Sequence, residues 1–274
     1  MSKIYTYVTR GSLVESTHES KCILKDYNFK TIFTTGHEKD IVYPRSAIKI
    51  FQAIPFIESN AHIDFKLSQK QLAISCSSHC GEPEHIKTLE EWIKKIKIIK
   101  KKLQCGIHNP LNKKESDKLL LSGLKPNELH NNCAGKHLGM ITACITSRMN
   151  IDTYVQINHP HQKKIRKILE YFTESEIKKI QKGVDGCSAP QYAFPLKNLS
   201  IAMINLIKEF KETKKFTKEM KTLLSAIEKY PHLTGSKSIY SSQLMEVTNG
   251  KIFCKGGAEG VLLFAHKEKK IGGV

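Results

Sequence analysis

The chain has 274 residues, 40% hydrophobic and 26% charged, a composition typical of a globular protein with one large domain or two small ones. No apolar run reaches the roughly 18 residues that a membrane-spanning helix needs, so we expect no membrane partner. The formal charge of +18 suggests nucleic acid, but 40 of the 44 basic residues are lysines spread over predicted helix surfaces. Because nucleic-acid sites cluster arginine with exposed aromatic side chains, we expect no nucleic-acid partner.

The N-terminus and the cysteines indicate the compartment. Residues 1–7 lack the apolar core of a signal peptide and are typical of a strand, so we expect a cytoplasmic protein. The chain has eight cysteines. Without a secretion signal, these are expected to be free thiols, catalytic thiols or metal ligands rather than disulfides.

The first part of the chain is predicted to be β-rich. Short runs of β-forming residues are separated by turn residues, which predicts an antiparallel meander with strands at 4–9, 12–15, 22–24 and 31–33.

The predicted helix that follows carries the first candidate site. Pro44 and Ser46 mark its start, and Ser46 and Lys49 are three residues apart, so their side chains share one helix face. Ser-x-x-Lys is a known arrangement in which a lysine acts as the base for a nucleophilic serine. A serine at a helix start beside a surface lysine is the alternative interpretation, and the motif alone does not decide between them.

Helices are predicted through the middle of the chain, and strands return at its end. Their approximate ranges are 67–78, 86–104, 133–144, two pieces within 160–183, 198–211 and 215–229 for helices, and 251–254 and 261–266 for strands, with loops at 183–192 and 255–260. This order predicts a single α+β domain over residues 1–274, with an antiparallel sheet formed by N- and C-terminal strands and helices between and around it.

Five sequence blocks together resemble the asparaginase II family of Rhizobium type. The blocks follow the family's order over nearly the whole chain and are Arg45–Ala53, Cys76–His85, His130–His137, Gly183–Pro190 and Lys255–Gly260. The resemblance implies an L-asparagine amidohydrolase, active as a homodimer, with a fold similar to serine β-lactamases and glutaminases.

The resemblance also implies the site residues. It implies two Ser-Lys pairs, Ser46 with Lys49 and Ser78 with Lys255. It implies a zinc ion held by Cys133, Lys136 and Cys187, and a substrate pocket lined by Arg45 and Asp185.

Physical chemistry supports some of these roles more directly than others. A lysine is a base only when neutral, and burial beside a second cation lowers its pKa from about 10.4 toward that state. Thiolates suit zinc, whereas lysine is a rare ligand because it must first lose a proton. In an asparaginase, Asp185 would pair with the substrate's α-ammonium and Arg45 with its α-carboxylate.

Each candidate also has a structural interpretation. Ser78 could be a turn serine with Ser77 as its competitor, Asp185 a turn residue, and Cys133 and Cys187 buried cysteines. The histidines His79, His85, His159 and His161 are interpreted as structural.

The expected reaction is an acyl-enzyme hydrolysis in which Ser46 attacks the side-chain amide of asparagine with Lys49 as base. Two alternatives stay open. One is a related serine amidohydrolase acting on glutamine, peptides or β-lactams. The other is an inactive, truncated zinc-binding homologue, because the family continues beyond the end of this sequence and the chain is expected to lack that C-terminal part.

Overall fold

The computed structural model describes residues 3–274, and its main sheet joins the two ends of this range. Five strands pair in the order β4-β3-β11-β10-β9, all antiparallel. They are β3 (Cys22–Lys25), β4 (Thr31–Thr35), β9 (Ile252–Gly256), β10 (Leu262–His266) and β11 (Ile271–Gly273). The predicted α+β class, with N- and C-terminal strands in one antiparallel sheet, is confirmed.

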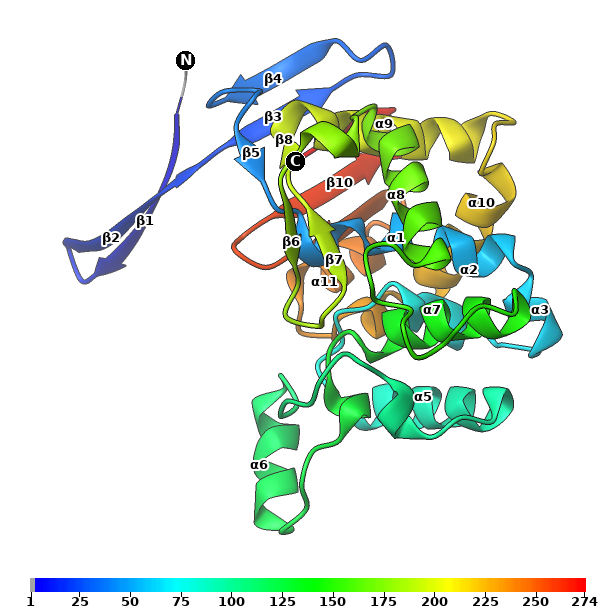
Figure 1. Ribbon diagram of the computed structural model, residues 1–274. Coiled ribbons are helices and arrows are strands. Elements are labelled where there is room, and N and C mark those ends of the chain that lie inside the picture. The colour runs from blue at the N-terminus through cyan, green and yellow to red at the C-terminus, as the bar shows by residue number, and fades with distance from the viewer. Residues whose placement is uncertain (1–2) are drawn as a thin grey trace.

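Helices cover this sheet and continue away from it (Figure 1). Helix α9 (Leu196–Lys211) packs against β3, β10 and β11, and α11 (Tyr240–Val247) packs against β9. The next helices inward are α1 (Lys49–Gln52), α8 (Pro160–Thr173) and α10 (Thr217–Lys229). Amphipathic spacing explains α8 and α10, whose apolar residues face the core while lysines face solvent.

Helix α7 (Ala134–Thr146) lies inside the helical layer and is buried from Ala134 through Cys144. It packs against α2 (Ile54–Glu58), α4 (Gln69–Ser75), α5 (Pro83–Ile96) and α8. The short helix α3 (Ala61–Asp64) follows α2, and α6 (Lys113–Leu121) projects at the end of the molecule far from the sheet (Figure 1). No helix in residues 3–274 is long and apolar enough to cross a membrane.

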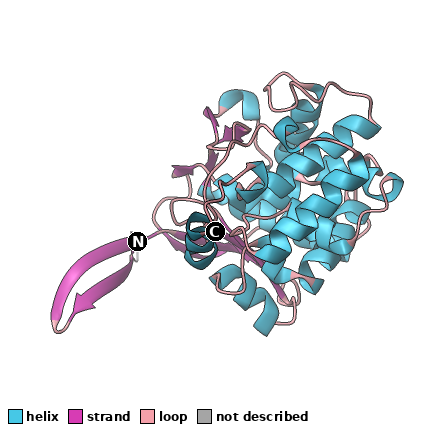
Figure 2. Cartoon of the chain, turned by 90° about the horizontal axis from the view of Figure 1, so that it is seen from below, coloured by secondary structure: helices cyan, strands magenta, loops and turns pink. Residues whose placement is uncertain are grey.

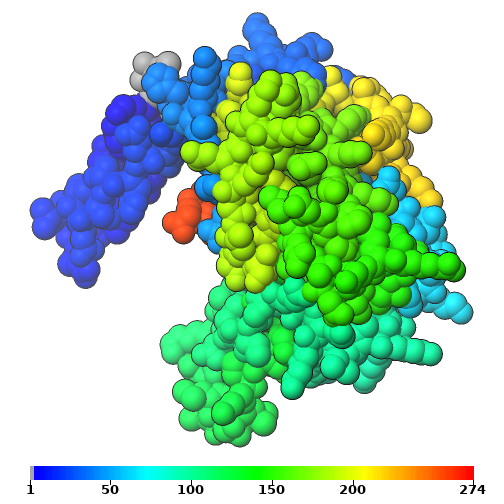
Figure 3. Space-filling model, viewed as in Figure 1, coloured from blue at the N-terminus to red at the C-terminus, as the bar shows by residue number. Residues whose placement is uncertain are grey.

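The predicted N-terminal meander is wrong in one respect. Strands β1 (Ile4–Arg10) and β2 (Leu13–Ser20) pair only with each other, and the main sheet begins at β3. The hairpin β1–β2 projects from the body (Figure 2), and the space-filling view shows a recess between the two (Figure 3). Alternating β-forming residues predict strands correctly, but they do not specify which strand pairs with which.

A second correction concerns residues 183–192, which were expected to be a loop. They form most of a short hairpin, β6 (Lys182–Val184) with β7 (Pro190–Tyr192). Asp185 N–H donates to the carbonyl of Ala189 at 2.9 Å, which closes the turn between the strands. Its Gly, Asp and Pro content indicates the turn, but strands of three residues are too short to show a period of two. A last pair joins β5 (Ile41–Val42) to β8 (Phe194–Pro195).

Candidate active site

Ser46 lies in a 3₁₀ turn (Arg45–Ile48) that runs directly into α1, so the predicted helix start is confirmed. Arg45 begins this turn with a φ of 51°, in the left-handed region that a non-glycine residue seldom adopts. Such backbone conformations concentrate at functional sites. The turn exposes part of Ser46 to a cavity of about 530 Å³ and buries Lys49 completely behind it.

Most of the predicted site residues line this one cavity, although they come from five separate segments. Its wall includes Arg45, Ser46, Ser78, Cys133, Asp185, Cys187 and Lys255. Lys49 and Lys136 lie buried against the same wall, where they contact Ser78 and Cys187. All nine predicted side chains therefore meet in one region.

The amino group of Lys49 contacts Ser78 rather than Ser46. Its Nζ donates to the Ser77 carbonyl, to Ser78 Oγ at 3.0 Å and to the Cys133 thiol at 3.2 Å. Within residues 3–274 no hydrogen bond joins Lys49 to Ser46. An ammonium group has three donors, and these three contacts engage all of them. In this arrangement Lys49 is a hydrogen-bond donor to Ser78.

Lys255 is the lysine with the lowered pKa. It lies near the end of β9 and is only 4% exposed. Burial first, and the nearby Lys49 ammonium second, lower the pKa of Lys255 to about 7. The two effects that the sequence analysis named for a basic lysine therefore act on Lys255, which is partly neutral near pH 7.

A glycine permits the close approach of β9 to the turn that carries Ser46. A Cβ on Gly257 would lie 2.3 Å from the Pro44 carbonyl oxygen, which is far inside contact distance. The N–H of Gly257 already donates to Val261 at 2.7 Å, so it is not free to bind a substrate oxygen. The absence of a side chain at residue 257 therefore places Lys255 and Ser46 at the same cavity.

Arg45 and Asp185 form an ion pair across the cavity wall. Arg45 Nε and Nη2 lie 2.8 and 2.7 Å from Asp185 Oδ1, and the Asp185 side chain is only 8% exposed. Burial alone would raise the pKa of Asp185, but the charges of Lys136 and Arg45 and the hydrogen bonds from Arg45 and the Gly186 N–H outweigh it and lower that pKa. A second cavity of about 480 Å³ shares both residues. The pair thus offers one cation and one anion to a zwitterionic ligand.

The proposed zinc ligands form a compact group of sulfur and nitrogen atoms. Lys136 Nζ lies 3.0 Å from Cys187 Sγ, and the Cys133 thiol interacts directly with Cys187. Hydrogen bonding from Cys133, together with the Lys136 charge, lowers the pKa of the Cys187 thiol against the effect of burial. Burial alone would lower the pKa of Lys136, but the two sulfur groups raise it.

This donor set fits zinc through its sulfur atoms. Two neighbouring cysteines, one favouring the thiolate, are suitable zinc ligands, and Lys136 would complete the set only after losing its proton, which its raised pKa opposes. Residues 3–274 contain no group of three or more His, Cys, Asp or Glu side chains that could hold a metal. A metal at this cavity therefore depends on the lysine as its third ligand.

The sequence analysis missed several residues that shape the site. Asn131 is one of them: its side-chain oxygen accepts from the Cys133 N–H at 2.9 Å, and its amide nitrogen donates to the Cys105 carbonyl at 2.8 Å. These bonds fix Cys133 at the start of α7. Asn131 lies inside the third family block, His130–His137, so its position was a usable signal. Other missed wall residues are Cys80, His108, Leu111, Asn132, Ile239 and Ser241.

The fold and the cavity together define a candidate enzyme with two serines, three buried lysines and two cysteines at one site. The family model described as L-asparaginase II matches residues 6–274, and the chain belongs to this family. The family indicates an amidohydrolase acting on a small molecule, with L-asparagine hydrolysis as its broad activity. A search of curated proteins finds no match.

Proposed function

We propose that the protein hydrolyses L-asparagine to L-aspartate and ammonia through an acyl-enzyme formed on Ser46. One observation carries this proposal: Ser46, Ser78 and Lys255 line one cavity, and Lys49 contacts Ser78 beside it. Ser46 Oγ attacks the side-chain amide carbon, ammonia leaves, and water then cleaves the aspartyl ester.

The geometry supports a role for all four residues in moving the proton of Ser46. Lys49 is the predicted base, but its amino group donates to Ser78 at 3.0 Å and must first lose a proton. Lys255, with a pKa of about 7, is the residue able to accept that proton. We propose that Ser78 relays it, so that Lys49 becomes neutral and accepts the proton of Ser46.

The Arg45–Asp185 pair supplies the binding site for the substrate's α groups in this proposal. The α-carboxylate binds Arg45 and the α-ammonium binds Asp185, so the ligand exchanges partners with an existing ion pair. Asp185→Asn should raise KM for asparagine by about 10-fold or more, since one charge-assisted contact is worth about 1.5–3 kcal/mol. An unchanged KM would remove this role from Asp185.

Cys133, Lys136 and Cys187 would hold zinc beside this cavity. Bound zinc would act as a Lewis acid toward a substrate oxygen or would orient the substrate. Backbone N–H groups near Ser46 and in the 255–258 segment are proposed to stabilise the oxyanion, with Gly257 excluded because its N–H is already bonded.

Three broader features belong to the same proposal. The fold is proposed to be similar to serine β-lactamases and glutaminases, the location cytoplasmic, and the assembly a homodimer. The hairpin β1–β2 supports the homodimer, because Tyr7 and Leu13 are 59% and 72% exposed on an arm that projects from the body. A second copy of the chain would cover these apolar side chains.

Ammonia release from L-asparagine tests the proposal. Wild type should release ammonia, and Ser46→Ala should lose nearly all of this activity. The control is Ser122→Ala, which removes an exposed serine at the end of α6 and should behave like wild type. Equal rates in wild type and Ser46→Ala would eliminate the nucleophile assignment. Glutamine and a chromogenic β-lactam, assayed in parallel, separate the related serine hydrolases from an asparaginase.

A further inference from the structure

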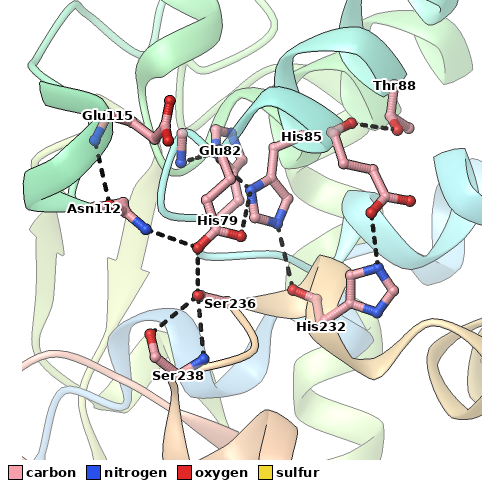
Figure 4. Close-up of polar contacts among 11 residues, drawn as sticks. His79, Glu82, His85, Thr88, Asn112, Glu115, His232, Ser236 and Ser238 are labelled. Atoms are coloured by element: carbon pink, nitrogen blue, oxygen red, sulfur yellow. Dashed lines mark hydrogen bonds and ion pairs between the residues drawn. The ribbon is translucent and has the colours of Figure 1, made fainter. Parts of the chain in front are cut away.

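The segment between Ser78 and α5 belongs to a family block, yet the proposed chemistry uses only its serine. Residues 79–85 lead from the cavity into the first turn of α5. In the structure they form a polar network with the 108–112 and 232–238 segments (Figure 4). Residues of this network are adjacent in sequence to residues that line the cavity.

The carboxylate of Glu82 is the point where the three segments join. Its Oε1 accepts from Ser236 Oγ at 2.6 Å and from Asn112 Nδ2 at 2.9 Å. Burial alone would raise the pKa of Glu82, but these two hydrogen bonds contribute to lowering it, so the group is an ionised acceptor. Hydrogen bonds to an ionised acceptor are stronger than those between neutral groups.

Each partner of Glu82 is one residue away from the cavity wall. Asn112 follows Leu111, and Ser236 follows Gly235. Glu82 itself is two residues beyond Cys80, which also lines the cavity. A shift of the carboxylate would therefore move three parts of the wall together.

Backbone hydrogen bonds connect the same segments to Ser78. Ser78 N–H donates to the Thr234 carbonyl at 2.9 Å, Cys80 N–H to Gly235 at 3.1 Å, and Asn112 N–H to Cys80 at 2.9 Å. The position of Ser78 thus depends on where the 234–236 backbone lies.

Neighbouring histidines support the network as neutral rings. His85 Nδ1 accepts from the Glu82 N–H at 3.1 Å, and His85 stacks on His79 with ring centroids 5.2 Å apart. Burial lowers the pKa of both rings. Ser236 and Asn112 are the side-chain hydrogen-bond donors to Glu82.

We propose that Glu82 is a positioning residue of the active site, which holds the 111–112 and 235–236 segments against Ser78 and so fixes the cavity wall around the substrate. The role rests on the proposed function, because the substrate is asparagine only if that function holds. Displacement of a wall by about 1 Å can reduce the rate by about 100-fold.

The test compares Glu82→Ala with Glu91→Ala. Both remove a carboxylate associated with α5, but Glu91 is exposed and takes part in none of the hydrogen bonds of this network. With both variants shown to be folded by thermal melting, Glu82→Ala should lose about 10- to 100-fold in kcat/KM, whereas Glu91→Ala should stay near wild type. Glu82→Gln keeps an oxygen acceptor in place and should recover most of the activity.

A second readout does not depend on activity. Hydrogen exchange of the Ser78 and Cys80 amides should be faster in Glu82→Ala than in Glu91→Ala, because their acceptors lie on the segment that Glu82 fixes. If Glu82→Ala does not fold, Ser236→Ala and Asn112→Ala each remove one partner and should show the same two effects in smaller degree. Unchanged kcat/KM or unchanged exchange in these variants overturns the proposal. Absence of ammonia release by wild type overturns the proposed function instead, and the exchange measurement still decides the role of Glu82.

Discussion

Two lysines share one buried site, and their surroundings give them different roles. Lys49 has an acceptor for each of its three protons, whereas Lys255 donates only a long hydrogen bond of 3.4 Å to Gly256 within the described chain. Hydrogen bonds therefore offset the cost of burying the Lys49 amino group, whereas the cost of burying the Lys255 amino group has little such offset. This difference helps to explain why Lys255 is partly neutral near pH 7.

The pKa of Lys255 predicts the pH dependence of the reaction. Because the neutral amine is the form that accepts a proton, kcat/KM should rise with pH through about 7 and level off above it. Lys255→Arg cannot supply a neutral side chain and should give a low, flat profile. Ammonia release measured between about pH 5 and 9 checks this. A wild-type profile with no inflection near 7 would contradict the assignment.

The same shift affects stability with a defined sign. The folded-state pKa of Lys255 lies below its unfolded value of 10.5, so the unfolded chain binds more protons between the two values. Its contribution to stability therefore rises with pH from about 7 toward 10.5 and is constant below 7. The site thus works near the pH at which the destabilising effect of this lysine reaches its full size.

At the scale of elements, the contact between β9 and the Ser46 turn depends on a single missing side chain. Gly257→Ala would place a Cβ 2.3 Å from the Pro44 carbonyl oxygen, so strand and turn must move apart. We expect a lower melting temperature and a loss of kcat/KM of at least about 10-fold.

Gly256→Ala is the matched control for this change. A Cβ on Gly256 meets no atom within 4 Å, and the substitution should leave the melting temperature near that of wild type. Equal melting temperatures for the two variants would show that the close approach is not required.

The turn between β6 and β7 carries both a proposed substrate contact, Asp185, and a proposed metal ligand, Cys187. Cys187→Ser should abolish stoichiometric zinc after dialysis, because it removes the sulfur whose pKa is lowered. Cys22→Ser, on strand β3, is the control and should retain zinc. Mass spectrometry measures the zinc content of the two variants. Zinc retained by Cys187→Ser would remove this residue from the ligand set.

At the scale of the molecule, the hairpin β1–β2 contributes little to the core. All but one of its strand residues are exposed, and none is fully buried. Deletion of residues 1–20 should therefore leave the body folded while converting the proposed homodimer to a monomer. Light scattering coupled to gel filtration measures the mass, and a dimer that survives the deletion would exclude the hairpin from the interface.

The sequence predicted those strands and helices whose positions follow from local residue patterns. The terminal strands and the longer helices were found because their apolar residues repeat regularly, as in α8 and α10. Helix α6 was missed because none of its residues is buried, so no apolar face marks it. The separate pairing of β1 with β2 depends on strand partners, which the period of a strand does not encode.

The features of the site likewise divide into those that the sequence predicts and those that depend on contacts between distant segments. The family blocks predicted the nine residues that meet at the cavity, but not that Lys49 would contact Ser78 instead of Ser46. That contact depends on where α4 ends relative to α1. Similarly, the partners of Glu82 are 30 and 154 residues away along the chain, and no spacing rule connects such residues.

The position of β11 in the sheet has a consequence for synthesis. β11 lies between β3 and β10, so β3 leaves the ribosome long before its neighbour exists. Until then one side of β3 presents unpaired N–H and C=O groups, which other chains can bind. The sheet can close only after translation has reached residues 271–273, and such long-range pairing is slow. The growing chain is therefore expected to need chaperones that shield this strand until its central partner emerges.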